Sequence, residues 1–198
     1  IPSFNAVNGG QTPVVATITV TPTANGCVGP DQMVTITVNP APVVDPIADD
    51  ILCANDATNA VVFTSTTPGT AFGWSNDLTS IGLGAVGAGD IPSFTGLNAG
   101  ATPSVATISV VPTAGGCVGA AESFTITVNP LPVVFAGNDI TICEGDQAIL
   151  TASGALNYVW TAPVVDGQPF TPVTGNYVTT GTDANGCIGT DDVNIIVE

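Results

Sequence analysis

Residues 16–38 read ATITVTPTANGCVGPDQMVTITV, and residues 106–128 read ATISVVPTAGGCVGAAESFTITV. Both stretches begin and end with apolar residues that alternate with threonine or serine. Because this period of two with β-branched side chains is typical of half-buried antiparallel strands, each stretch predicts a strand pair. The dipeptides Asn25-Gly26 and Gly115-Gly116 tolerate positive φ and predict a tight hairpin between the strands. Asn185-Gly186 predicts the same turn near the end of the chain, where we expect the last two strands of another β-sandwich.

These stretches belong to a longer internal repeat. Residues 1–44 and 91–134 align without a gap at an offset of 90, with identical residues at 29 of 44 positions. Such self-similarity indicates an array of like modules. Proline-rich segments at residues 39–42 (NPAP) and 129–132 (NPLP) mark the borders, because proline cannot continue a strand ladder and favours short, semi-rigid linkers.

The borders divide the chain into three units. Residues 41–130 form one complete module and residues 131–198 a shorter variant, whereas residues 1–40 match only the C-terminal half of a module. We expect the missing first half upstream in a parent protein or on another chain. The predicted fold class is all-β, with antiparallel β-sandwich modules arranged end to end as a stiff rod.

The composition excludes several classes of function. The chain of 198 residues has 16 acidic residues and no Lys, Arg or His, which gives a net charge of −16. No cation is present to displace phosphate counterions, so we expect no nucleic-acid partner. No apolar run reaches the length of a membrane span, so we expect no membrane insertion. Without a His, Lys or Arg to act as base or to activate a nucleophile, an enzyme is not expected.

The five cysteines are Cys27, Cys53, Cys117, Cys143 and Cys187. No CxxC pair and no histidine is present to form a zinc site. Cys53 and Cys143 lie early in their modules, while Cys117 and Cys187 lie in the final hairpin turn. These equivalent places predict the disulfides Cys53–Cys117 and Cys143–Cys187 and an extracellular, oxidising setting. The partner of Cys27 is expected in the first half-module, outside residues 1–40.

Two long segments carry a resemblance to a known family. Residues 91–132, with the motifs IPSFTGLNAG, ATISVVPTAGGCVG and FTITVNPLP, resemble the PKD-like and immunoglobulin-like tandem repeats of very large cell-surface adhesins of Bacteroidota. Residues 140–197, from ITICEGDQAIL to TDANGCIGTDDVNIIV, are similar to a related module of such proteins. Many such proteins resemble cell-surface adhesins, including gliding-motility adhesins that are exported by the type IX secretion route.

The resemblance implies a structural and adhesive role at the cell surface. The expected partners are other modules of the same protein, neighbouring copies of the chain, and surface glycans. One alternative is a self-assembling filament subunit whose incomplete first module is completed by strands from neighbouring chains. A second alternative is a carbohydrate-binding module of a secreted enzyme, for which Trp74 and Trp160 would be the sugar-stacking candidates. The patterns around both tryptophans favour a core position instead.

Carboxylates follow each linker, and hard oxygen ligands of this kind suit calcium. The candidates are Asp45, Asp49, Asp50, Asp139, Glu144 and Asp146. A solvated acidic rim is the simpler interpretation, and no other cofactor is expected. Asp183 resembles the start of a calcium loop, but further ligands do not follow at the required spacing.

One glycine motif also needs a structural explanation. Residues 82–87 (GLGAVG) match the GxGxxG fingerprint of dinucleotide-binding sites, but no helix-forming segment follows them, so the motif predicts a glycine loop.

Overall fold

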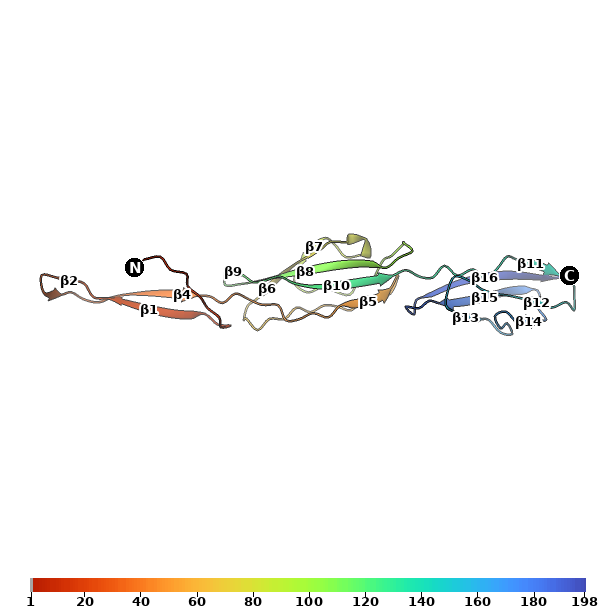
Figure 1. Cartoon of the computed structure of the whole chain (residues 1–198), viewed down its shortest axis with the longest axis horizontal. Coiled ribbons are helices and arrows are strands. Elements are labelled where there is room, and N and C mark those ends of the chain that lie inside the picture. Colours follow the sequence, from red (N-terminus) through yellow and green to blue (C-terminus); the bar gives the residue numbers. More distant parts are fainter. Residues whose placement is uncertain (1) are drawn as a thin grey trace.

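The computed structural model describes residues 2–198, which form strands and one short 3-10 helix. Figure 1 shows three groups of strands that follow one another along the long axis. The first group contains β1 (Val14–Val20), β2 (Thr23–Ala24), β3 (Cys27–Val28) and β4 (Gln32–Val38). The second contains β5 (Asp50–Cys53), β6 (Ala71–Asn76), η1 (Thr79–Ile81), β7 (Val86–Ala88), β8 (Ser104–Ala114), β9 (Cys117–Val118) and β10 (Glu122–Asn129). The third contains β11 (Ile140–Ile142), β12 (Ala148–Ile149), β13 (Asn157–Trp160), β14 (Pro169–Phe170), β15 (Gly175–Thr182) and β16 (Ile188–Val197).

The second and third groups share one topology. The strand order is β5-β10-β8-β6-β7 in the second group and β11-β16-β15-β13 in the third, which adds a small β12–β14 pair. In both, the predicted hairpin joins the last two long strands, which pair antiparallel. The first strand pairs parallel with the last, β5 with β10 and β11 with β16. The alternation pattern predicted antiparallel strands and did not reveal these parallel pairs.

Each of these groups encloses its own hydrophobic core. The core of the second group joins side chains of β8 and β10 to residues outside the main sheet, such as Phe63, Ile81 and Ile91. The core of the third group includes Trp160, Tyr177, Val193 and Ile195. No core residue is shared between the two clusters in the described part of the chain. The chain is therefore all-β and built from immunoglobulin-like β-sandwich modules, as the alternating strands predicted.

The first group reproduces the last two strands of the second. β1 pairs with β4 in the same register, shifted by 90 residues, as β8 pairs with β10. Asn98 fixes the loop before β8 by donating hydrogen bonds to the carbonyl oxygens of Thr102 and Val128, at 2.8 and 2.7 Å. Asn8 makes the same bonds to Thr12 and Val38, at 2.9 and 2.8 Å. The sequence repeat is thus a structural repeat in which the amide ties the loop to the last strand.

The first group differs in having an uncovered apolar face. Val110 and Phe124, on β8 and β10, are 0% and 3% exposed, because other segments of the module pack on them. The equivalent Val20 and Val34, on β1 and β4, are 47% and 54% exposed. No strand besides β1 and β4 belongs to this sheet among residues 2–198, so its two strands lack the covering layer that buries their counterparts.

Candidate functional site

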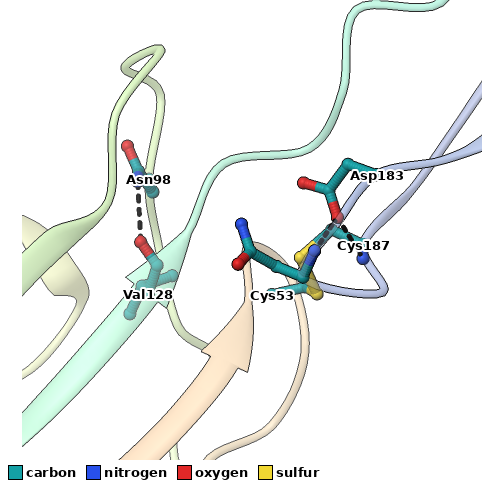
Figure 2. Close-up of a disulfide and its surroundings, with 6 residues drawn as sticks. Cys53, Asn98, Val128, Asp183 and Cys187 are labelled. Atoms are coloured by element: carbon teal, nitrogen blue, oxygen red, sulfur yellow. Dashed lines mark hydrogen bonds between the residues drawn. A yellow bond between two sulfur atoms is a disulfide. The ribbon is translucent and has the colours of Figure 1, made fainter. Parts of the chain in front are cut away.

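The junction between the second and third groups contains the single disulfide of the described residues. Cys53, at the end of β5, is bonded to Cys187, in the turn between β15 and β16, with 5.5 Å between the two Cα atoms (Figure 2). The two cysteines are 134 residues apart in the sequence. The bond therefore joins one module to the next, across the linker that follows β10.

The predicted disulfides Cys53–Cys117 and Cys143–Cys187 are wrong, and strand direction explains why. In the parallel pair β5–β10, Cys53 lies opposite Asn129, at the C-terminal end of β10. Cys117 precedes β10, so it lies at the other end of the module, more than about 30 Å away along an extended strand. A disulfide needs Cα atoms within about 7 Å. The same parallel pairing of β11 with β16 places Cys143 and Cys187 at opposite ends of the third module.

Three cysteines are free within residues 2–198. Cys27 and Cys143 are exposed, and Cys117 is half-buried. Cys27 lies in the β2–β3 hairpin, at the end of the chain opposite to the C-terminus, and Cys143 directly follows β11 near the C-terminus (Figure 1). The partner predicted for Cys27 falls outside residues 1–40, so the structure does not test it.

Asp183 organises the turn that presents Cys187. One oxygen, Oδ1, accepts hydrogen bonds from the backbone N–H groups of Asn185 and Cys187, both at 2.8 Å (Figure 2). Gly186 has a φ of 84°, whereas in the hairpin of the second module both Gly115 and Gly116 have positive φ. The predicted hairpins are present, but the third is wider by one residue and is closed by this aspartate. Asp183 therefore holds the turn, which accounts for a carboxylate at this position without calcium.

The linkers lie directly on a glycine of the following module. A Cβ atom on Gly119 would overlap the carbonyl oxygen of Pro42, and one on Gly189 would overlap that of Pro132. Both glycines stand two residues after the hairpin cysteine of their module. Gly29 has the same place in the first group, where the nearest atom to an added Cβ is the Pro22 side chain, at 3.0 Å. A glycine after the hairpin is thus what lets each linker pass close to the module that it enters.

The junction between the first and second groups is held without a disulfide. The side chain of Asn39 donates a hydrogen bond of 2.7 Å from Nδ2 to the carbonyl oxygen of Gly115, in the hairpin of the second module. Asn39 corresponds to Asn129, which lies beside Cys53 at the other junction. The hairpin of each module thus meets the end of the preceding strand pair at both junctions.

Four of the six carboxylates considered for calcium accept hydrogen bonds from the chain's own polar groups. Asp49 accepts a hydrogen bond of 2.6 Å from the backbone N–H of Thr125 on β10, and Asp139 accepts one of 2.8 Å from Asn194 on β16. These equivalent residues immediately precede β5 and β11, so each fixes the parallel strand against the last one. Asp50 accepts hydrogen bonds from Asn59, and Asp45 accepts one from Thr64. Neither Glu144 nor Asp146 completes a group of three potential ligands, and residues 2–198 contain no such group.

Asp49 provides a test of this interpretation through pH. The backbone hydrogen bond from Thr125, aided by the Thr125 side chain, holds the pKa of Asp49 below its usual value of 3.8. A lowered pKa stabilises the folded state above the ordinary pKa, and this contribution disappears as the pH falls through the folded value. The variant Asp49→Asn is therefore expected to melt below the wild type at neutral pH, and this difference is expected to shrink below about pH 4.

The control for this test is Asp56→Asn, because the Asp56 side chain makes no hydrogen bond in the described structure. Thermal unfolding between pH 2 and 7, followed by circular dichroism, measures both variants against the wild type. A melting difference for Asp49→Asn that stays constant down to pH 2 would contradict the role of the ionised carboxylate.

Both tryptophans belong to the cores. Trp160 is 7% exposed and donates a hydrogen bond of 2.8 Å from Nε1 to Asp166. Trp74 packs against the core of the second module, and a Cβ on Gly87 would overlap its ring. Gly87 is the last glycine of the GxGxxG match, and Gly82 follows η1 with a φ of 101°. The motif therefore serves a turn and a ring contact, and Trp160 is too buried to stack on a sugar.

Comparison with known proteins identifies no family: no family model and no curated protein sequence matches the chain. Among solved structures, the two-domain DIP-gamma IG1+IG2 is 10% identical, with 80% of this chain and 98% of that chain covered and a TM-score of 0.38. The insect immune protein hemolin is 16% identical, with 92% and 56% covered and a TM-score of 0.37.

A third structure is the SGBP-B protein of a mixed-linkage glucan utilization locus of Bacteroides ovatus, solved with a mixed-linkage heptasaccharide. It is 16% identical, with 79% of this chain and 48% of that chain covered and a TM-score of 0.33. At such identities and TM-scores, the fold assignment rests on the strand order and the two cores, and the functions of these proteins are not transferred. No helix among residues 2–198 is long and apolar enough to cross a membrane.

Proposed function

We propose that this chain is a section of an extracellular, filamentous surface protein, in which β-sandwich modules form a stiff rod that projects an adhesive region from the cell. The observation that carries this proposal is the disulfide between Cys53 and Cys187, which joins two successive modules. Such a bond prevents the two modules from separating, which suits an element that carries mechanical load. The role is structural, and no catalytic step belongs to it.

Two contacts at this junction support stiffness. The disulfide fixes the end of β5 to the turn before β16, and the Pro132 backbone lies against Gly189 on the same module. A hinge needs freedom on at least one side of its axis. The disulfide and the backbone contact reach the third module from β5 and from the linker, and they meet it two residues apart, so both restrict motion at this joint.

The setting follows from the same bond and from the surface. Disulfides persist in oxidising compartments, which supports a place outside the cytoplasm. A net charge of −16 with no basic residue keeps such rods soluble and mutually repelling. Within this setting, the repeats resemble those of the Bacteroidota adhesins, and the proposal extends that resemblance to function.

X-ray scattering of the oxidised chain tests the rod. A compact protein of this length has a radius of gyration of about 16 Å. The 11 residues of β8 span about 37 Å, so three such units in line predict a radius of gyration of about 30 Å. A value near 16 Å in dilute solution would overturn the proposal.

A second candidate function is a self-assembling filament subunit, in which another chain covers the apolar face of β1 and β4. Val20 and Val34 on this face stand where Val110 and Phe124 are buried in the second module. Strands from a neighbouring chain, equivalent to residues 41–90, would cover the face by completing the sandwich. The scattering experiment separates the two functions: a rod keeps its radius of gyration from micromolar to millimolar concentration, whereas a filament subunit grows.

A further inference from the structure

Cys143 stands in the same local structure as Cys53, although no other cysteine of residues 2–198 is bonded to it. Cys53 ends β5, which runs parallel to β10, and Cys143 directly follows β11, which runs parallel to β16. The residue after each cysteine donates its backbone N–H to the end of the last strand: Ala54 to Asn129 and Glu144 to Glu198, both at 2.8 Å. Cys53 and Cys143 are thus held at the C-terminal end of their modules by equivalent contacts.

The turns that follow the two cysteines also agree. Asn55 and Gly145, two residues after Cys53 and Cys143, have φ values of 73° and 91°. The backbone N–H of the next residue, Asp56 or Asp146, returns to the carbonyl oxygen of the cysteine at 3.1 Å in both turns. The backbone that aims Cys53 at the next module is therefore already formed at Cys143, where no module follows within residues 2–198.

The complementary half of the bond is also present at the other end of the chain. The hairpin that carries Cys187 reads Ala-Asn-Gly-Cys at residues 184–187, and residues 24–27 have the same sequence. Cys27 is exposed in this hairpin, at the end of the molecule opposite to Cys143 (Figure 1). Each end of the chain thus carries a different half of the junction observed in the middle.

We propose that Cys143 is half of a second intermodular disulfide, and that its partner is the hairpin cysteine of a module of this same kind stacked on the C-terminal end. The inference rests on the proposed rod function and names what the rod's end binds. It rests on the observed Cys53–Cys187 bond, because the two cysteines share strand pairing, backbone hydrogen bonds and turn. The module arrives either on the same polypeptide or as the hairpin of Cys27 on a second copy.

Closure of this bond needs a disulfide oxidant, for which oxidised glutathione serves. The Cys143 thiolate attacks the glutathione disulfide and releases one glutathione thiolate. The hairpin thiolate of the arriving module then attacks the Cys143 sulfur and releases the second. Two protein thiols lose two protons and two electrons, and one oxidised glutathione becomes two reduced molecules.

The test extends the full chain by a second copy of residues 130–198 after Glu198. Glu198 corresponds to Asn129, so this addition repeats the observed junction with Cys143 in the place of Cys53. The added copy carries Cys143→Ser, which removes a competing thiol, and Ile188→Val, which gives its hairpin peptide a mass of its own. After oxidation with glutathione, cleavage at acidic residues separates all cysteines, and mass spectrometry of unreduced peptides identifies the pairs. We expect Cys143 bonded to the hairpin cysteine of the added copy, about tenfold above any other new pair, because the junction gives an effective concentration on the order of millimolar.

The matched control carries Cys187→Ser in the added copy alone, and there Cys143 should end as a mixed disulfide with glutathione. Cys143 bonded to Cys117, or left unpaired while the added hairpin cysteine is intact, would overturn the inference. The unextended chain tests the second copy as the source: a Cys143–Cys27 bond that increases with protein concentration identifies it, and glutathione adducts alone exclude it.

The two proposals fail separately in this experiment. The extended chain should also have a larger radius of gyration than the chain of 198 residues. If the extended chain has the larger radius of gyration but Cys143 does not bond to the added hairpin, the rod proposal is supported and the proposed disulfide at Cys143 is refuted. If the disulfide forms but both chains are compact, the rod proposal is refuted and the proposed disulfide at Cys143 is supported.

Discussion

When the chain is pulled from its two ends until it unfolds, we expect the oxidised form to reach about one third of the contour length of the reduced form. Force enters at the N-terminus, crosses from Cys53 to Cys187 through the disulfide, and leaves at the C-terminus. The two cysteines are 134 residues apart, and the segment between them does not extend. At about 3.5 Å per residue, the oxidised chain is therefore shorter by about 470 Å. Most of both hydrophobic cores lies inside this protected segment.

Single-molecule force spectroscopy measures this difference as contour length, with and without a reductant. The matched control is the double variant Cys53→Ser, Cys187→Ser, which should extend fully whether or not the reductant is present. Equal contour lengths for the oxidised and reduced wild type would show that force does not pass through this bond.

The second large effect is expected from Gly189→Val. A valine side chain at this position would occupy the space of the Pro132 carbonyl oxygen. Because this oxygen belongs to the backbone, it cannot move aside by a side-chain rotation. Forcing extra volume into a close contact costs about 1–3 kcal/mol, so the linker is expected to leave the module surface. Because this contact lies beside the disulfide, we expect slower closure of Cys53–Cys187 from the reduced state and a smaller radius of gyration as the joint bends.

Gly29→Val is the control for this variant, because within residues 2–198 no linker crosses Gly29 and the nearest atom to an added Cβ belongs to a proline side chain, at 3.0 Å. Thiol titration during oxidation and X-ray scattering report the two effects separately. Closure rates and dimensions of Gly189→Val that match those of Gly29→Val would contradict the role given to the linker contact.

Much of the fold was predictable from local patterns. The alternating stretch at Phe124–Val128 forms part of β10, and the Gly115-Gly116 dipeptide forms the hairpin that precedes it. These features depend on residues close in sequence, where side-chain periodicity and turn conformation act directly. The β-sandwich class follows from them.

The disulfide was not predictable in the same way, because it depends on strand direction. The four residues of β5 contain no alternation long enough to show whether the strand runs parallel or antiparallel to β10. Either direction leaves Cys53 early in the module, yet only one places it at the C-terminal end. A signal was present in Gly119 and Gly189, since a glycine two residues after each hairpin cysteine indicates a close backbone neighbour at that end of the module.

The carboxylates show a similar difference between composition and position. Asp49 and Asp139 were considered as calcium ligands because acidic residues gather after each linker. Their equivalence at an offset of 90 residues indicates a shared structural task, and both accept a hydrogen bond from the neighbouring last strand. Residue type alone does not distinguish an ion ligand from an acceptor for a backbone N–H group.

The contact of each linker with a glycine also determines the symmetry of a longer assembly. Pro42 on Gly119 and Pro132 on Gly189 place two successive linkers against the same position of the module that each linker enters. Repetition of such a contact turns every module by the same angle relative to its predecessor and generates a screw axis. A rod of identical modules joined in this way therefore has a polarity and a pitch, and any surface feature of one module recurs along a helical path at regular intervals.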